Sequence, residues 1–116
     1  MTNPRELARI CKCLSVDTRL RLLKLLQDQT LCVGALARRL GVTPGAVSQH
    51  LRILRDAGLV IPEKRGYFVH YHVNHEALDG WLAAVREALG SETRARYAVQ
   101  AFPISITDTE KGEKDV

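Results

Sequence analysis

The chain has 116 residues, which is the length of one domain, so one function per subunit is expected. Its 17 lysines and arginines against 13 aspartates and glutamates leave a formal net charge of +4, and a basic fold is a candidate for binding a polyanion. The sequence has neither a run of about 18 apolar residues nor a basic-then-apolar N-terminus, which excludes a membrane span and a signal peptide and predicts a cytoplasmic protein.

Two helices are predicted in the first quarter of the chain. The first covers 4–14, because its apolar residues recur at spacings of three and four. These residues are Leu7, Ile10, Cys11 and Leu14. The second runs from Ser15, a residue type that caps helix N-termini, to about Gln27. Its buried side is expected to hold Leu20, Leu23 and Leu26. The short break between the two helices predicts that they pack as neighbours.

A helix-turn-helix is predicted over 33–57. The third helix covers 33–40 and stops at Gly41, which suits a left-handed C-terminal cap. The fourth helix begins at Thr43-Pro44, a hydroxyl N-cap followed by proline at the first helical position, and ends near Gly58. Two amphipathic helices joined by three residues are the sequence form of this motif.

A β-hairpin and a further helix complete the predicted fold. Strands are predicted over 59–61 and 67–73, with a basic turn over 62–66 between them. A fifth helix over 76–89 carries one apolar stripe, and a short sixth helix is predicted over 92–100. The stripe consists of Leu78, Trp81, Leu82, Val85 and Leu89. The folded domain is expected to span 1–102, and the charged segment 103–116 is expected to be disordered.

The fourth helix carries the residues that suit DNA reading. Val47, Leu51 and Leu54 recur at spacings of four and three and are expected to face the core. The opposite face then presents glutamine and arginine, which bond adenine and guanine edges, and small residues that allow close approach. The residues expected at DNA are Thr43, Gly45, Ala46, Ser48, Gln49, His50, Arg52 and Arg55, with Lys64 and Arg65 at the hairpin tip. The alternative is an ordinary solvated helix face.

Three segments make the chain resemble the ArsR-type family of metal-responsive repressors. They are LSVDTRLRLL at 14–23, LCV at 31–33 and VSQHLRILRDAGLV at 47–60. The likeness covers about 7–89, and 48–60 is its most specific part. It implies a winged helix-turn-helix of five or six helices and a homodimer that blocks transcription until an inducer releases it from a palindromic operator. The fourth helix would enter the major groove, with half-sites about 10 bp apart.

The resemblance also implies a dimer interface built from the first and fifth helices. The expected residues are Leu7, Ile10, Leu14, Leu78, Trp81, Leu82 and Val85. The alternative for this stripe is an internal core helix.

The inducer site is expected at cysteine thiolates. Three cysteines, an odd number, argue against a disulfide framework. Similar proteins that sense arsenite carry a Cys-Val-Cys segment where this chain has Cys32-Val33-Gly34, so Cys11 or Cys13 would complete a soft-metal or metalloid site. Residues two apart on a helix point roughly 200° apart. Cys11 and Cys13 can therefore bind one ion together only if the helix is broken there. Alternatives are a thiol-oxidation sensor, a regulator without an inducer site and, for Cys11, a buried core thiol.

The remaining sequence signals concern a histidine metal site, an enzyme and a protein-binding module. His70 and His72 share one face of a strand, and with His75 they suit a zinc or nickel site, but a solvated hairpin face has the same pattern. No phosphate loop or nucleophile–base arrangement indicates an enzyme. A winged helix that binds proteins instead of DNA would need an acidic or apolar fourth-helix face, and Gln49, Arg52 and Arg55 oppose that alternative.

Overall fold

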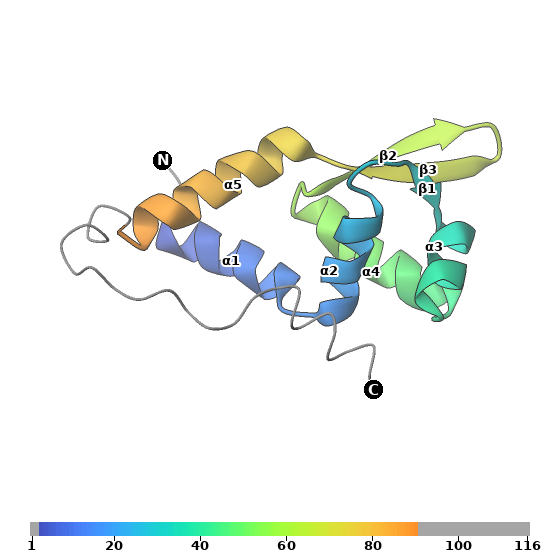
Figure 1. Cartoon of the computed structure of the whole chain (residues 1–116), viewed down its shortest axis with the longest axis horizontal. Helices are drawn as coiled ribbons and strands as arrows, with labels where there is room; N and C mark the ends of the chain where they lie inside the picture. The colour runs from blue at the N-terminus through green and yellow to red at the C-terminus, as the bar shows by residue number, and fades with distance from the viewer. Residues whose placement is uncertain (1–2, 91–116) are drawn as a thin grey trace.

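The computed structural model describes residues 3–90, which hold five helices and three strands (Figure 1). In chain order they are α1 (Pro4–Leu14), α2 (Asp17–Leu25), β1 (Leu31–Cys32), α3 (Val33–Leu40), α4 (Pro44–Asp56), β2 (Val60–Arg65), β3 (Phe68–Val73) and α5 (His75–Ala88). The mainly helical winged helix-turn-helix predicted from the sequence is confirmed. The predicted sixth helix, the boundary at residue 102 and the tail over 103–116 lie outside the described residues.

The turn between α3 and α4 forms as its sequence predicts. Gly41 ends α3 with φ at 69°, in the left-handed region where glycine is favoured. Thr43 caps α4, because its Oγ1 accepts a hydrogen bond of 3.1 Å from the backbone N–H of Ala46. Pro44 occupies the first turn of α4, where a missing N–H costs nothing. The end of α3 and the start of α4 are therefore specified by local signals.

The start of α2 differs from the prediction. Ser15 is the C-cap of α1, and its hydroxyl donates to the Lys12 carbonyl at 2.8 Å, so it does not cap α2. The N-cap of α2 is Val16, without a side-chain hydrogen bond, and the helix ends at Leu25. A serine between two helices can serve either one, and here the preceding carbonyl is its partner.

The buried face of α2 is also rotated relative to the prediction. Leu20 is 50% exposed, whereas Leu22, Leu23 and Leu26 are buried. At about 100° per residue these three leucines span one arc, and Leu20 lies roughly 110° from its centre. The packing of α2 against α3 and α4 selects that arc.

The sheet contains one strand that the sequence did not reveal and a longer hairpin. Its order is β1-β3-β2, all antiparallel. The predicted turn over 62–66 is wrong, because β2 continues to Arg65 and the loop is Gly66–Tyr67. Pro62 is tolerated within β2 because β2 is an edge strand. Lys64 and Arg65 consequently lie on the last two positions of β2, beside the tip instead of at it.

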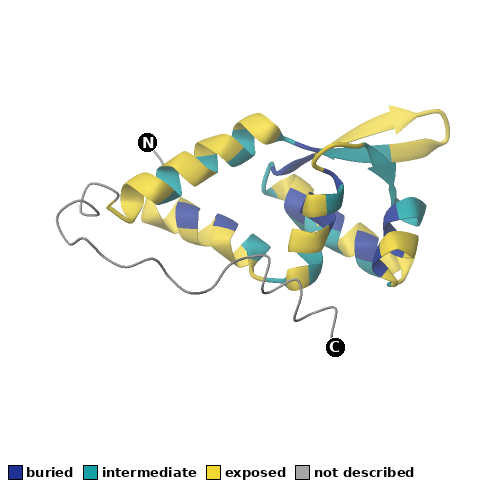
Figure 2. Ribbon diagram, viewed as in Figure 1, coloured by how far each residue is buried: buried dark blue, intermediate teal, exposed yellow. Residues whose placement is uncertain are grey.

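The molecule has two parts. The head consists of α2, α3, α4 and the sheet, and the arm consists of α1 packed beside α5 (Figure 1). Burial is concentrated in the head, whose fully enclosed side chains come from several elements (Figure 2). They are Leu22, Leu26, Leu36, Val47, Leu51, Leu54 and Leu59. Among the described helices, none is both long and apolar enough to span a bilayer.

Candidate nucleic-acid interface

The outer face of α4 is polar and open to solvent. Val47, Leu51 and Leu54 are buried, as predicted, which turns Ser48, Gln49 and Arg52 outward. Arg55 is also exposed and lies 3.3 Å from the Asp56 carboxylate. Because three leucine and valine anchors set the rotation of the helix, the outward direction of this face is determined by the core.

The N-terminal end of α4 is open to solvent. Thr43, Pro44 and Gly45 are exposed, and Ala46 is half-buried. A Cβ built on Gly45 would have no atom within 4 Å, so packing inside the chain does not require glycine there. A helix N-terminus with free N–H groups attracts phosphate.

His50 is held by an arginine that the sequence reading missed. Arg19 Nε donates to His50 Nδ1 at 3.2 Å, and Arg19 Nη1 donates to the Cys13 carbonyl at 3.1 Å. A neutral imidazole that accepts at Nδ1 carries its proton on Nε2, which leaves a donor for a phosphate. No local pattern reveals this contact, since Arg19 and His50 are 31 residues apart.

The wing, formed by β2 and β3, carries two basic side chains beside two exposed aromatic rings. Arg65 is paired with a carboxylate, and Lys64 is exposed. Arg65 Nε lies 2.6 Å from Glu63 Oε2, and this hydrogen bond lowers the pKa of the Glu63 carboxyl below its usual value. Lys64 is exposed on the neighbouring position. Tyr67 and Phe68 at the tip are 99% and 64% exposed. The wing therefore presents both charge and apolar surface.

The three cysteines lie on two different elements: Cys11 and Cys13 on α1, and Cys32 on β1 directly before α3. Cys11 is exposed on α1, which contradicts the alternative of a buried core thiol, although its neighbour Ile10 is buried. Cys13 and Cys32 are half-buried, on α1 and at the start of α3. Within residues 3–90 of one subunit, no group of three His, Cys, Asp or Glu side chains is placed to hold a metal ion.

Two of the three histidines of the predicted zinc or nickel site lie on one strand, and the third begins a helix. His70 and His72 share one face of β3, but His75 begins α5 with its Nε2 3.2 Å from the Gln27 carbonyl oxygen. The structure therefore does not assemble the three-histidine zinc or nickel site. His70 instead lies between Cys32 on β1 and Glu63 on β2 in the strand register.

The arm buries part of the predicted dimer interface within one subunit. Leu7 and Ile10 are already buried there. Leu14, Leu78, Trp81 and Val85 are half-buried, and Leu82 is 50% exposed. Among these side chains, Leu82 on α5 therefore keeps the largest exposed fraction.

Comparison with known proteins finds one consistent group. The family described as bacterial regulatory protein, arsR family, matches residues 17–61. The arsenic resistance transcriptional regulator ArsR1 of Pseudomonas putida is 34% identical over 77 residues, which are 66% of this chain and 59% of that protein. This chain thus spans less than two thirds of that relative's length.

Solved structures agree with the family match. An ArsR-like transcriptional regulator from Rhodococcus is 33% identical with a TM-score of 0.68, covering 81% of this chain and 88% of that one. A homodimeric winged helix-turn-helix DNA-binding domain from Mycobacterium bovis is 24% identical with a TM-score of 0.61, covering 78% and 84%. At that identity the second likeness shows a shared fold only.

Proposed function

This chain belongs to the ArsR family of DNA-binding transcriptional regulators and is not an enzyme, and from that premise we propose that it is a homodimeric repressor of a palindromic operator. The observation that carries this proposal is the outer face of α4. A buried core aims Gln49 and Arg52 away from the protein, and these side chains form paired hydrogen bonds with base edges in the major groove.

The surroundings of α4 support docking on a duplex. Gly45 and the capped N-terminus allow the helix to approach a phosphate, and Arg38 and Arg39 lie exposed in the last turn of α3. Lys64 on the wing adds a contact to the backbone or the minor groove. Two such subunits would meet half-sites about one helical turn, or 10 bp, apart.

A dimer is supported by the arm. Leu82 leaves half of its surface exposed on α5, next to the half-buried Trp81 and Val85. The Mycobacterium bovis domain of the same fold is homodimeric. We place the interface on this side of α5.

The inducer in this proposal is a soft metal ion or an arsenite-like metalloid bound to cysteine thiolates. Three thiolates are the ligands such ions prefer, and the Pseudomonas putida relative is an arsenic resistance regulator. Since residues 3–90 of one subunit do not bring three ligands together, we propose that Cys32 of one subunit acts with Cys11 or Cys13 of the other.

The DNA-reading part of the proposal is tested by selecting an operator from random duplexes at about 150 mM salt, where specific contacts outweigh phosphate attraction. A Gln49→Ala, Arg52→Ala variant should lose about 2–6 kcal/mol of operator affinity, because each paired contact contributes about 1–3 kcal/mol. Arg86→Ala, which removes an exposed cation from α5, is the matched control. Unchanged operator affinity in the double variant would refute the assignment of α4.

The inducer part is tested by titrating the reduced dimer with arsenite and with cadmium while counting free thiols. Loss of two or three thiols per subunit at near-stoichiometric ligand, with release of DNA, is expected. A Cys11→Ser, Cys13→Ser variant should lose this response. If that variant still left DNA on arsenite addition, the three-thiol site would be wrong.

A further inference from the structure

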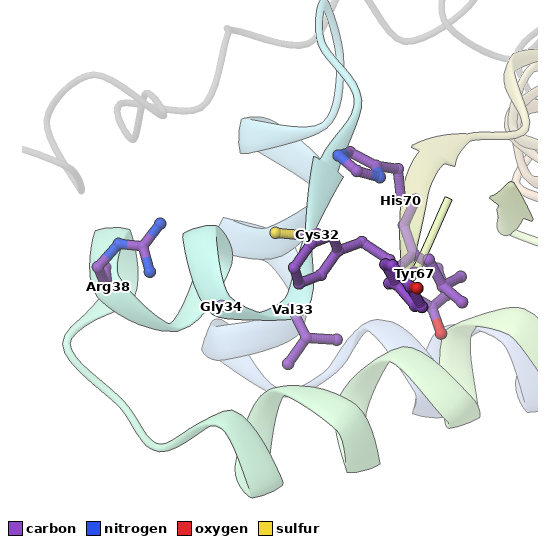
Figure 3. A pocket seen from close by; sticks show the side chains of 9 residues that line it. Cys32, Val33, Gly34, Arg38, Tyr67 and His70 are labelled. Carbon is purple, nitrogen blue, oxygen red and sulfur yellow. The ribbon is translucent and has the colours of Figure 1, made fainter. Parts of the chain in front are cut away.

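A cavity of about 570 Å³ lies between the start of α3 and the wing strand β3. It is lined by Cys32, Val33, Arg38, Tyr67, Phe68 and His70, among others. Figure 3 shows the Cys32 sulfur between the Arg38 and His70 side chains in this view. Cavities of this size hold small organic molecules, and the valine and aromatic walls suit an apolar one. A thiol, an imidazole and a guanidinium therefore border one apolar space.

Cys32 and His70 are direct cross-strand partners. Cys32 on β1 pairs with His70 on β3, and such partners share a face with Cβ atoms about 4.5–5.5 Å apart. His70 Nδ1 is shielded from solvent and has no hydrogen-bond partner in the described part of the chain. A buried polar atom without a partner is costly, so this nitrogen is available to accept a proton from a nearby group.

The Arg38 guanidinium lies over Gly34, at the same end of α3. A Cβ built on Gly34 would lie 3.5 Å from Arg38 Nη1, so the arginine folds back over the first turn of α3. Cys32 is the N-cap of that helix, and its side chain makes no capping hydrogen bond. The half-buried thiol therefore shares the lining of one cavity with a guanidinium and a proton acceptor, two kinds of group that accompany reactive cysteines.

From this arrangement we propose that the cavity is a covalent modification site, at which Cys32 adds to organic electrophiles of the α,β-unsaturated carbonyl class. The thiol proton passes to His70, the sulfur bonds to the β-carbon, and the electron pair of the C=C bond moves to the carbonyl oxygen. Arg38 stabilises the resulting enolate. The proton on His70 then goes to the α-carbon, so the net change is addition of S–H across the double bond, with no oxidant or reductant.

The adduct has a route to the DNA-binding surface, and this part rests on the proposed function. Cys32 begins α3, the first helix of the helix-turn-helix, and β1 is bonded to the wing strand β3. A group attached to Cys32 would occupy the space between these two elements. It is expected to displace the wing relative to α4 and to weaken operator binding.

The modification is tested on the full-length protein with N-phenylmaleimide, an aromatic acceptor, by following adducts at each cysteine with mass spectrometry. Cys11 is the internal standard because it is exposed, whereas Cys32 is half-buried. Cys32 should react about tenfold faster or more, since acid–base assistance alone contributes about 10² or more. His70→Asn and Arg38→Ala should remove most of this advantage while leaving the Cys11 rate unchanged.

Matched controls separate the proposed site from simple exposure. His72→Asn changes the other histidine on the same face of β3 and should leave the Cys32 rate intact. Acrylamide, which lacks an aromatic body, should show a smaller preference for Cys32. If Cys32 reacts no faster than Cys11, or if His70→Asn slows both cysteines equally, the site is refuted.

The regulatory consequence has its own readout. Operator affinity of the singly modified protein should fall about tenfold or more, and Cys32→Ser should be immune to the reagent. Selective modification with unchanged affinity would overturn the proposed coupling. Failure of the unmodified protein to bind any duplex would instead count against the proposed function, so the two failures are distinguishable.

Discussion

Gly34 occupies the position at which similar arsenite sensors carry the second cysteine of their Cys-Val-Cys segment. In this structure a Cβ at Gly34 would meet only the Arg38 guanidinium, at 3.5 Å, which is an ordinary contact with the flexible end of a side chain. A cysteine therefore fits at position 34 without moving the backbone. Its absence separates this chain from a sensor whose thiolates all lie at the start of one helix.

Gly34→Cys is predicted to strengthen arsenite binding by about 10²-fold or more, because a second thiolate on the same turn acts at high effective concentration. Thiol loss on titration should increase by one per subunit. Gly80→Cys is the control, since it adds an exposed thiol on α5 where a Cβ meets no atom within 4 Å. Equal arsenite affinities for the two variants would contradict the prediction.

At the scale of single elements, α4 is positioned by its core anchors and by one polar tie. Arg19 on α2 bonds both the His50 ring on α4 and the last turn of α1 through the Cys13 carbonyl. Three helices thus meet at one guanidinium, which is half-buried. Any displacement of Cys13 can reach the DNA-reading helix through this side chain.

Arg19→Leu is expected to lower the free energy of unfolding by about 1–3 kcal/mol, since two charge-assisted hydrogen bonds are lost. Urea denaturation measures this change. Arg21→Leu, which removes an exposed arginine from the same helix, should cost less than about 0.5 kcal/mol. Similar losses of unfolding free energy in both variants would show that the hydrogen bonds of Arg19 to His50 and Cys13 do not stabilise the fold.

The wing is an element whose charge is partly neutralised by its own acid. The hydrogen bond and charge of Arg65 lower the pKa of Glu63 from its ordinary value of 4.5. A depressed carboxyl pKa means that the ion pair contributes above that ordinary value and is lost as the pH falls through the lowered one. At neutral pH Glu63 is therefore ionised and holds Arg65.

Glu63→Gln is predicted to tighten binding to duplex DNA and to steepen its salt dependence by about one unit of slope, because Arg65 becomes available to a phosphate. Affinity measured at four or five salt concentrations gives both quantities. Glu76→Gln at the start of α5 removes an equal charge away from the wing and should have little effect. An unchanged slope in Glu63→Gln would mean that Arg65 does not meet DNA.

At the scale of the whole molecule, the head and the arm differ in how deeply their side chains are buried. The head holds the fully buried side chains, whereas α5 has no fully buried residue although it carries the only tryptophan. A helix with this many half-buried apolar residues gains most by packing against a further surface. A second copy of the arm supplies such a surface in the proposed dimer.

Leu82→Asp is predicted to shift the protein from dimer to monomer and to weaken operator binding, because a charge would be buried in the interface. Leu20→Asp is a closely matched control, since Leu20 and Leu82 are both 50% exposed in one subunit. Sedimentation velocity distinguishes the two states. If Leu20→Asp also produced monomers, or Leu82→Asp did not, the interface would lie elsewhere.

The sequence by itself determined the elements whose signals are local. The cap at Thr43, the left-handed Gly41 and the spacing of Val47, Leu51 and Leu54 involve partners within a few residues, so they predict α3, the turn and α4 correctly. The two hairpin strands and the helix α5 were predicted for the same reason, but the hairpin turn was wrongly placed at 62–66. These signals were enough for the fold and for the outward direction of Ser48, Gln49 and Arg52 on α4.

Only the tertiary structure decided which distant groups meet. β1 is two residues long and exists because it pairs with β3, which places Cys32 opposite His70. The hydrogen bond from Arg19 to His50 and the burial of Leu22 instead of Leu20 depend equally on how the elements pack. Such contacts carry no local periodicity, because their energy comes from pairing surfaces that are far apart along the chain.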